Sequence, residues 1–67
     1  MFTVEWLRNG ARVYGQAMYG DNTDDVLRQA RREAWRLDHA GNCPDTIRIT
    51  APDATDPLVA KIERFAD

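Results

Sequence analysis

One histidine and one cysteine stand close together in the sequence, and they are the first residues that could do chemistry. His39 and Cys43 are four residues apart, and a thiolate activated by an imidazole is an effective nucleophile. The base also needs a group that orients it, and no such group can be assigned along the chain. A simpler interpretation is that His39 favours the negative end of a helix and that Cys43 fills space in the core. We therefore expect no catalytic residues and no enzymatic function.

Acidic residues gather at Asp21, Asp24 and Asp25, in a pattern similar to the start of a calcium-binding loop. Such a loop takes oxygen ligands through about twelve positions and closes on a glutamate. The next glutamate, Glu33, comes one position late, and helix capping explains these acids better. The histidine, the cysteine and the scattered carboxylates also lack the spacing of a zinc site. We therefore expect no metal and no cofactor.

The most distinctive feature is a tryptophan among basic side chains on one side of a predicted helix. With about 100° of turn per residue, this side lies opposite the apolar stripe and carries Arg28, Arg32, Trp35, Arg36 and His39. Tryptophan and arginine dominate protein–protein binding sites, and tryptophan can also stack on bases while arginine binds phosphates. The alternative is an ordinary solvated face on which arginine stems cover the ring.

A second candidate surface is the uncovered face of the predicted sheet. Tyr14 and Met18 are expected there with Leu7 and Arg12, as a modest apolar patch of the kind that marks a dimer interface or a docking surface. A plain amphipathic outer face is the alternative. The candidate partner-binding residues are therefore Arg28, Arg32, Trp35, Arg36, His39, Tyr14 and Met18.

The first element that would position these residues is a β-hairpin. Residues 2–8 alternate with the period of a half-buried strand, Asn9-Gly10 suits a two-residue type I′ turn, and residues 11–19 form the return strand. This turn pairs Arg8 with Ala11, Trp6 with Val13, Val4 with Gly15 and Phe2 with Ala17. The face expected to be buried then carries Phe2, Val4, Trp6, Val13, Gly15 and Ala17.

A long helix is predicted over residues 24–40. Residues 21–23 offer three N-caps, Gly41-Asn42 closes the helix, and Pro44 prevents its continuation. The apolar stripe of this helix consists of Val26, Leu27, Ala30, Ala34 and Leu37.

The remaining residues predict a third strand and one ambiguous segment. Asp45–Ala51 alternates with Ile47 and Ile49 on one side. Asp56-Pro57 is typical of a helix start, which favours a C-terminal helix carrying Leu58, Val59, Ile62, Phe65 and Ala66; a fourth strand over Leu58–Phe65 is the alternative. The predicted fold is a single two-layer α+β domain spanning residues 1–67, with order β-β-α-β and a three-stranded antiparallel sheet packed on one long helix.

Charge and cysteine content narrow the function classes. The 67 residues carry nine basic and eleven acidic side chains, for a net charge of −2, whereas proteins that neutralise phosphates normally carry a basic excess. One cysteine excludes an intramolecular disulfide, and the sequence has neither a signal-peptide pattern nor an apolar run of about 18 residues. We therefore expect a cytoplasmic protein without a membrane span, and nucleic acid is disfavoured as a partner.

The segment from Phe2 to Leu37 resembles the small antitoxin domains of HicB-like type. The resemblance is carried by Gly20-Asp21-Asn22-Thr23 before the helix and by Ala30 with Glu33-Ala34. The Pro-Asp-x-Pro-Gly stretch usual in that family is missing, so no function is carried over from it.

Together these features predict a small non-enzymatic protein-interaction module. Its size fits an adaptor, an antitoxin-like protein, or an inhibitor or accessory protein from a phage, a mobile element or a bacterium, and homodimerisation is part of this expectation. The alternative is a nucleic-acid-binding module that uses the arginine and tryptophan face of the long helix.

Overall fold

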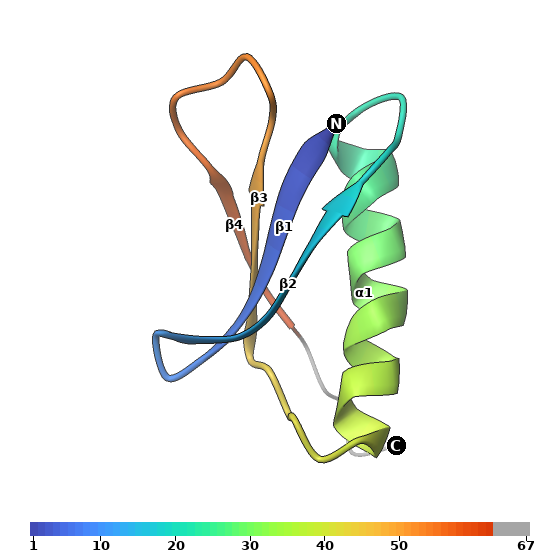
Figure 1. The fold of residues 1–67 in the computed structure, drawn as a ribbon, viewed down its shortest axis with the longest axis vertical. Coiled ribbons are helices and arrows are strands. Elements are labelled where there is room, and N and C mark those ends of the chain that lie inside the picture. Colours follow the sequence, from blue (N-terminus) through green and yellow to red (C-terminus); the bar gives the residue numbers. More distant parts are fainter. Residues whose placement is uncertain (63–67) are drawn as a thin grey trace.

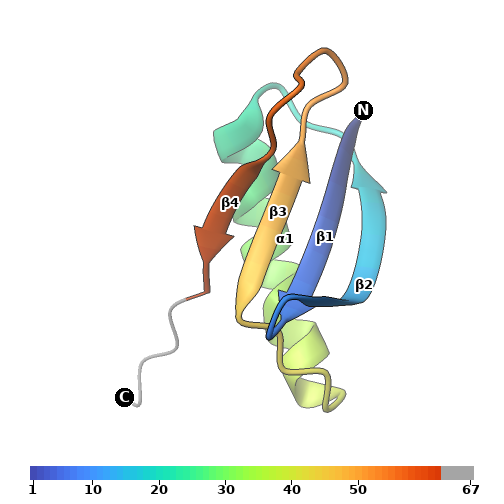
Figure 2. The same ribbon diagram turned by 90° about the vertical axis from the view of Figure 1, so that its left-hand side faces the viewer.

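The computed structural model describes residues 1–62, which form a two-layer α+β fold. The elements in chain order are β1 (Phe2–Arg8), β2 (Ala11–Met18), α1 (Thr23–His39), β3 (Thr46–Thr50) and β4 (Leu58–Lys61). The strands form one antiparallel sheet in the order β2-β1-β3-β4, and α1 covers one of its faces (Figure 1). In the view turned by 90°, the uncovered face of the sheet points toward the viewer and α1 lies behind the sheet (Figure 2). Residues 1–62 contain one helix, α1, and it is too short and too polar to cross a lipid bilayer.

The core lies between α1 and the two central strands. It is built from Val4, Trp6, Met18, Val26, Ala30, Ala34, Leu37, Ile47 and Ile49. The indole Nε1 of Trp6 donates a buried hydrogen bond to the carbonyl oxygen of Ala30 at 3.0 Å. The predicted apolar stripe of the helix is confirmed, with Leu27 partly buried at its edge.

The helix begins and ends where local sequence signals place it. The side chain of Asn22 caps the N-terminus and accepts a hydrogen bond from the backbone N–H of Asp25 at 2.9 Å. At the other end Gly41 takes a φ of 91°, and the N–H of Asn42 reaches the carbonyl oxygen of Leu37 at 2.9 Å. This is a Schellman ending, which needs a residue that tolerates positive φ, and glycine does so without strain.

The hairpin has the predicted turn, but its register differs from the predicted one. Asn9 and Gly10 take positive φ values of 53° and 83°, and Arg8 pairs with Ala11 as expected. The register then shifts, because Leu7 pairs with Arg12 while Trp6 pairs with Tyr14. Val13 is the extra residue of a β-bulge. The predicted pairs Trp6–Val13, Val4–Gly15 and Phe2–Ala17 are therefore wrong.

The bulge exchanges the two faces of β2 beyond Val13. Met18 is 8% exposed and belongs to the core, and Tyr14 lies across from Trp6 on the helix side. The expectation that Tyr14 and Met18 form a patch on the uncovered sheet face is therefore wrong. The physical reason is that a methionine and a tyrosine remove more apolar surface from water under the helix than Gly15 and Ala17 could.

Leu58–Lys61 is a strand, so the predicted C-terminal helix is wrong here and the alternative of a fourth strand is confirmed over these four residues. β4 pairs with β3, with Ala60 opposite Ile47 and Leu58 opposite Ile49. Ile62 packs against the core, and its backbone N–H donates to the carbonyl oxygen of Asp45 at 2.9 Å. Phe65 and Ala66 of the predicted helix lie outside the described residues.

Candidate functional site

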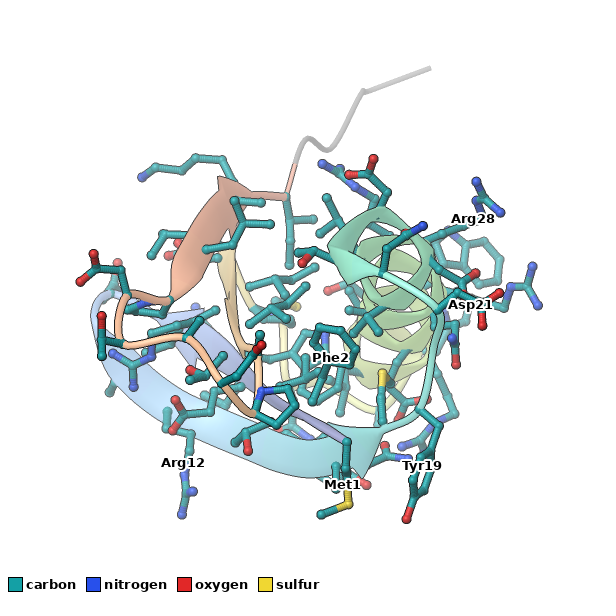
Figure 3. The ribbon with its side chains drawn as sticks, turned by 90° about the horizontal axis from the view of Figure 1, so that it is seen from above. Met1, Phe2, Arg12, Tyr19, Asp21 and Arg28 are labelled. Carbon is teal, nitrogen blue, oxygen red and sulfur yellow. The ribbon has the colours of Figure 1, made fainter. Side chains whose placement is uncertain are left out.

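The side of α1 that points away from the sheet carries the main candidate site. We call it the outer face of α1, and it consists of the exposed residues Arg28, Arg31, Arg32, Trp35 and His39. Figure 3 shows Arg28 projecting from the helix on the side away from the sheet. Trp35 is 69% exposed. Helical spacing brings Arg31 beside Trp35, one turn before it. Arg31 is not among the predicted site residues, although this spacing alone indicates it.

Trp35 is held in place by its neighbour one helical turn later. The rings of Trp35 and His39 lie 4.3 Å apart between centroids, tilted by 40°. Nδ1 of His39 lies 3.0 Å from the carbonyl oxygen of Trp35, and since a carbonyl only accepts, Nδ1 carries the proton of this bond. The histidine therefore limits the freedom of the indole ring and lowers the conformational entropy that the ring would lose on binding.

The three arginines of the outer face form no ion pair with any of the described residues. Within residues 1–62, the ion pairs involve Arg12, Arg36 and Arg48, and none involves Arg28, Arg31 or Arg32. Their guanidinium groups therefore keep their donors available to carboxylates of another molecule.

Arg36 belongs to a different cluster from the one predicted. Its guanidinium is paired with the carboxylate of Glu33 and lies over the ring of Tyr14, 6.0 Å from the centroid. The ring of Tyr14 in turn lies 5.4 Å from that of Trp6. The hydrogen bond to Glu33, and then the charge of that carboxylate, raise the pKa of Arg36 above its ordinary value. Arg36 and Tyr14 therefore connect α1 to the edge of the sheet, apart from Trp35.

The uncovered sheet face is organised around one carboxylate. Nε and Nη2 of Arg48 donate to Oε1 of Glu5 at 2.8 and 2.7 Å, and Nη1 of Arg12 lies 3.9 Å from Oε2 of Glu5. Figure 3 shows Arg12 on the side of the sheet away from the helix. Helical or strand periodicity cannot reveal this cluster, because it joins three strands and Glu5 and Arg48 are 43 positions apart.

The residues considered for catalysis and metal binding are not brought into a site. His39 is stacked on Trp35, and Cys43 is a half-exposed free thiol. Among residues 1–62, no group of three or more histidine, cysteine, aspartate or glutamate side chains is placed to hold a metal ion.

No family model matches this chain, and no curated protein and no solved structure matches it either. The resemblance to HicB-like antitoxin domains therefore receives no support from these comparisons.

The exposure of Trp35 can be measured directly, because the other tryptophan, Trp6, is fully buried. We expect the native protein to show two emission components, of which one is red-shifted and quenched by iodide. Trp35→Phe should remove this component and leave blue-shifted emission that iodide does not quench until the protein is unfolded. Iodide quenching that is the same in Trp35→Phe and wild type would contradict the placement of both rings.

Proposed function

We propose that this protein is a small non-enzymatic interaction module whose outer face of α1 binds a partner protein. The observation that carries the proposal is the 69% exposed Trp35, ordered by His39 and surrounded by arginines without an ion pair among residues 1–62. Tryptophan is more often buried than left in water on a helix, so this position favours a surface that becomes covered in a complex.

The chemistry of the outer face indicates what the partner presents. The large apolar ring of Trp35 can insert into an apolar pocket of a partner protein. The guanidinium groups of Arg28, Arg31 and Arg32 can donate bidentate hydrogen bonds to carboxylates around that pocket. Tryptophan and arginine are also the residue types that most often carry the binding energy of protein interfaces. The proposed partner is therefore a protein surface with an apolar pocket rimmed by aspartate or glutamate.

Nucleic acid is the less favoured partner of the same face. The helix carries four acidic side chains among its four arginines: Asp24, Asp25, Glu33 and Asp38. The whole chain has a net charge of −2, so a polyanion would be repelled at long range, whereas an acidic patch on a protein needs only the local arginines.

Affinity capture with matched variants tests the proposal. Wild type, Trp35→Ala, Arg32→Ala and Tyr19→Ala would be immobilised and exposed to an extract of the native host, with and without nuclease treatment, and bound proteins would be quantified by mass spectrometry. Tyr19 is the matched control, because it is 75% exposed and does not belong to the outer face of α1. We expect wild type and Tyr19→Ala to retain the same partner protein equally. The affinity of that partner for Trp35→Ala should be about 30-fold lower, which corresponds to the loss of about 2 kcal/mol at a hot spot.

Two outcomes would contradict this proposal. Equal capture by wild type, Trp35→Ala and Arg32→Ala would exclude the outer face of α1 as the binding surface. Retention that disappears with nuclease treatment and falls steeply with salt would instead indicate a nucleic acid. Thermal melts of all four proteins show whether a loss of capture arises from unfolding.

A further inference from the structure

A second surface follows from the position of β2 at the edge of the sheet (Figure 2). β2 is eight residues long, and seven of them are exposed. In an antiparallel pair every second residue directs its N–H and C=O away from the neighbouring strand. Within residues 1–62, no hydrogen bond to the backbone of residues 11–18 comes from anything other than β1. The outward groups of β2 are therefore free to form a further ladder.

β2 also lacks most of the features that keep edge strands from pairing. Natural edges are protected by charged residues, by proline, by bulges or by being very short. In β2 the charge of Arg12 and the bulge at Val13 both lie at the hairpin end, and residues 13–19 contain no charged residue and no proline. The opposite edge, β4, has four residues, follows Pro57 and carries Lys61. The unprotected edge is therefore the stretch from Tyr14 to Met18.

We propose that β2 pairs antiparallel with β2 of a second copy of this chain, so that two four-stranded sheets join into one. A two-fold axis places β2 of one copy beside β2 of the other. If the axis passes at Gln16, Tyr14 of each copy lies opposite Met18 of the other. The added strand covers the ring of Tyr14, which is 36% exposed in one copy.

The distribution of charge favours contact with a second copy at the β2 edge over contact through the outer face of α1 or the uncovered sheet face. Residues 13–19 are uncharged, so self-pairing of β2 sets no charged strand residues opposite one another. The two arginines that lie over Tyr14 and beside Gly15, Arg36 and Arg12, are paired with Glu33 and Glu5. Self-association through the outer face of α1 would oppose Arg28, Arg31 and Arg32 with the same three arginines. Self-association through the uncovered sheet face would bring together Arg12, Arg48 and Lys61 of both copies, and among the residues of the four strands only Glu5 adds a carboxylate there. Like charges set directly opposite destabilise such contacts.

Sedimentation velocity over a concentration series tests the dimer with the full chain. One strand pair is small beside the roughly 1,200–2,000 Å² of stable interfaces, so we expect a weak dimer that is populated by about 1 mM, the concentration that corresponds to a binding free energy of about −4 kcal/mol. Ala17→Lys places two lysines near the axis and should keep the protein monomeric at every concentration. Val59→Lys adds the same charge to an exposed position of β4 and should dimerise as wild type does.

A cross-linking variant locates the contact independently of the stability of Ala17→Lys. In a Cys43→Ser background, Gln16→Cys should form a disulfide-linked dimer on mild oxidation, and Val59→Cys should not. A wild-type chain that stays monomeric up to about 1 mM, or an Ala17→Lys variant that dimerises as wild type does, would overturn the proposal. Cross-linking through Val59→Cys with none through Gln16→Cys would overturn it as well. Because β2 and the outer face of α1 are separate surfaces, failure here leaves the partner-binding proposal standing, and the reverse also holds.

Discussion

Replacing Trp6 with alanine is expected to leave the chain unfolded at 25 °C. The side chain is fully buried, its indole bonds to the carbonyl oxygen of Ala30, and its ring contacts that of Tyr14. Removing a buried tryptophan costs about 3–5 kcal/mol. In a chain of 67 residues a single hydrophobic core rarely supplies more than about 3–5 kcal/mol of stability. The loss therefore equals most or all of the free energy of unfolding.

Trp35→Ala is the matched control for this experiment, because it makes the same chemical change at a position that is 69% exposed. We expect it to change the free energy of unfolding by less than about 1 kcal/mol. Far-ultraviolet circular dichroism with urea titration measures both variants, and Trp6→Phe should fall between them because it keeps a ring but loses the hydrogen bond. Similar unfolding midpoints for Trp6→Ala and Trp35→Ala would show that the core is not organised around Trp6.

Two glycine-to-alanine substitutions are expected to differ in their effect on stability. A Cβ at Gly20 would lie 2.7 Å from Cγ2 of Val26 and 2.9 Å from Oδ2 of Asp25. Val26 is fully buried, so its methyl group has little room to move. Gly20→Ala should therefore cost about 1–3 kcal/mol, the usual range for overpacking a core.

Gly15→Ala is the control, because the nearest neighbour of its Cβ would be the exposed side chain of Arg12 at 3.4 Å. Glycine within a strand is about 0.5–1 kcal/mol less stable than alanine, so this variant should be neutral or slightly stabilising. Thermal melts of the two variants give the comparison. A Gly20→Ala variant as stable as wild type would show that the approach of the β2–α1 connection to the helix can relax freely.

The helix was predictable because its signals are local. Capping by Asn22, the apolar stripe through Ala30 and the glycine ending at Gly41 all act within a few residues of the element they define. The exposure of Trp35 follows from the same periodicity, since a residue on the side opposite the stripe is turned away from the sheet.

The register of the hairpin was not predictable from its turn. Asn9-Gly10 determines the first pairs next to the turn, and a bulge at Val13 then exchanges the faces of β2. The register depends on what covers the sheet, because Met18 joins the core beneath α1 and Tyr14 meets Arg36 of α1 only when the helix lies on the sheet. Local alternation carries no information on that contact.

The structure of the C-terminal segment also depends on contacts with another element. Asp56-Pro57 has the local chemistry of a helix start, yet Leu58–Lys61 completes the sheet along the free edge of β3. Without β4 the N–H and C=O groups along that edge would have no strand opposite them, and the ladder satisfies them. A short apolar run fits a helix or a strand equally well by periodicity. Pairing with β3 therefore determines that residues 58–61 form a strand.

For this protein, local sequence signals were enough to predict the helix, the position of the hairpin turn, the third strand and the arginine-rich face around Trp35. Each of these depends on interactions within one element. Packing between elements determines which face of β2 is buried, that residues 58–61 form a strand, and that Arg36 pairs with Glu33 and Tyr14 instead of joining Trp35. Those features depend on contacts between segments far apart in the chain, whose energies appear only when helix and sheet are packed together.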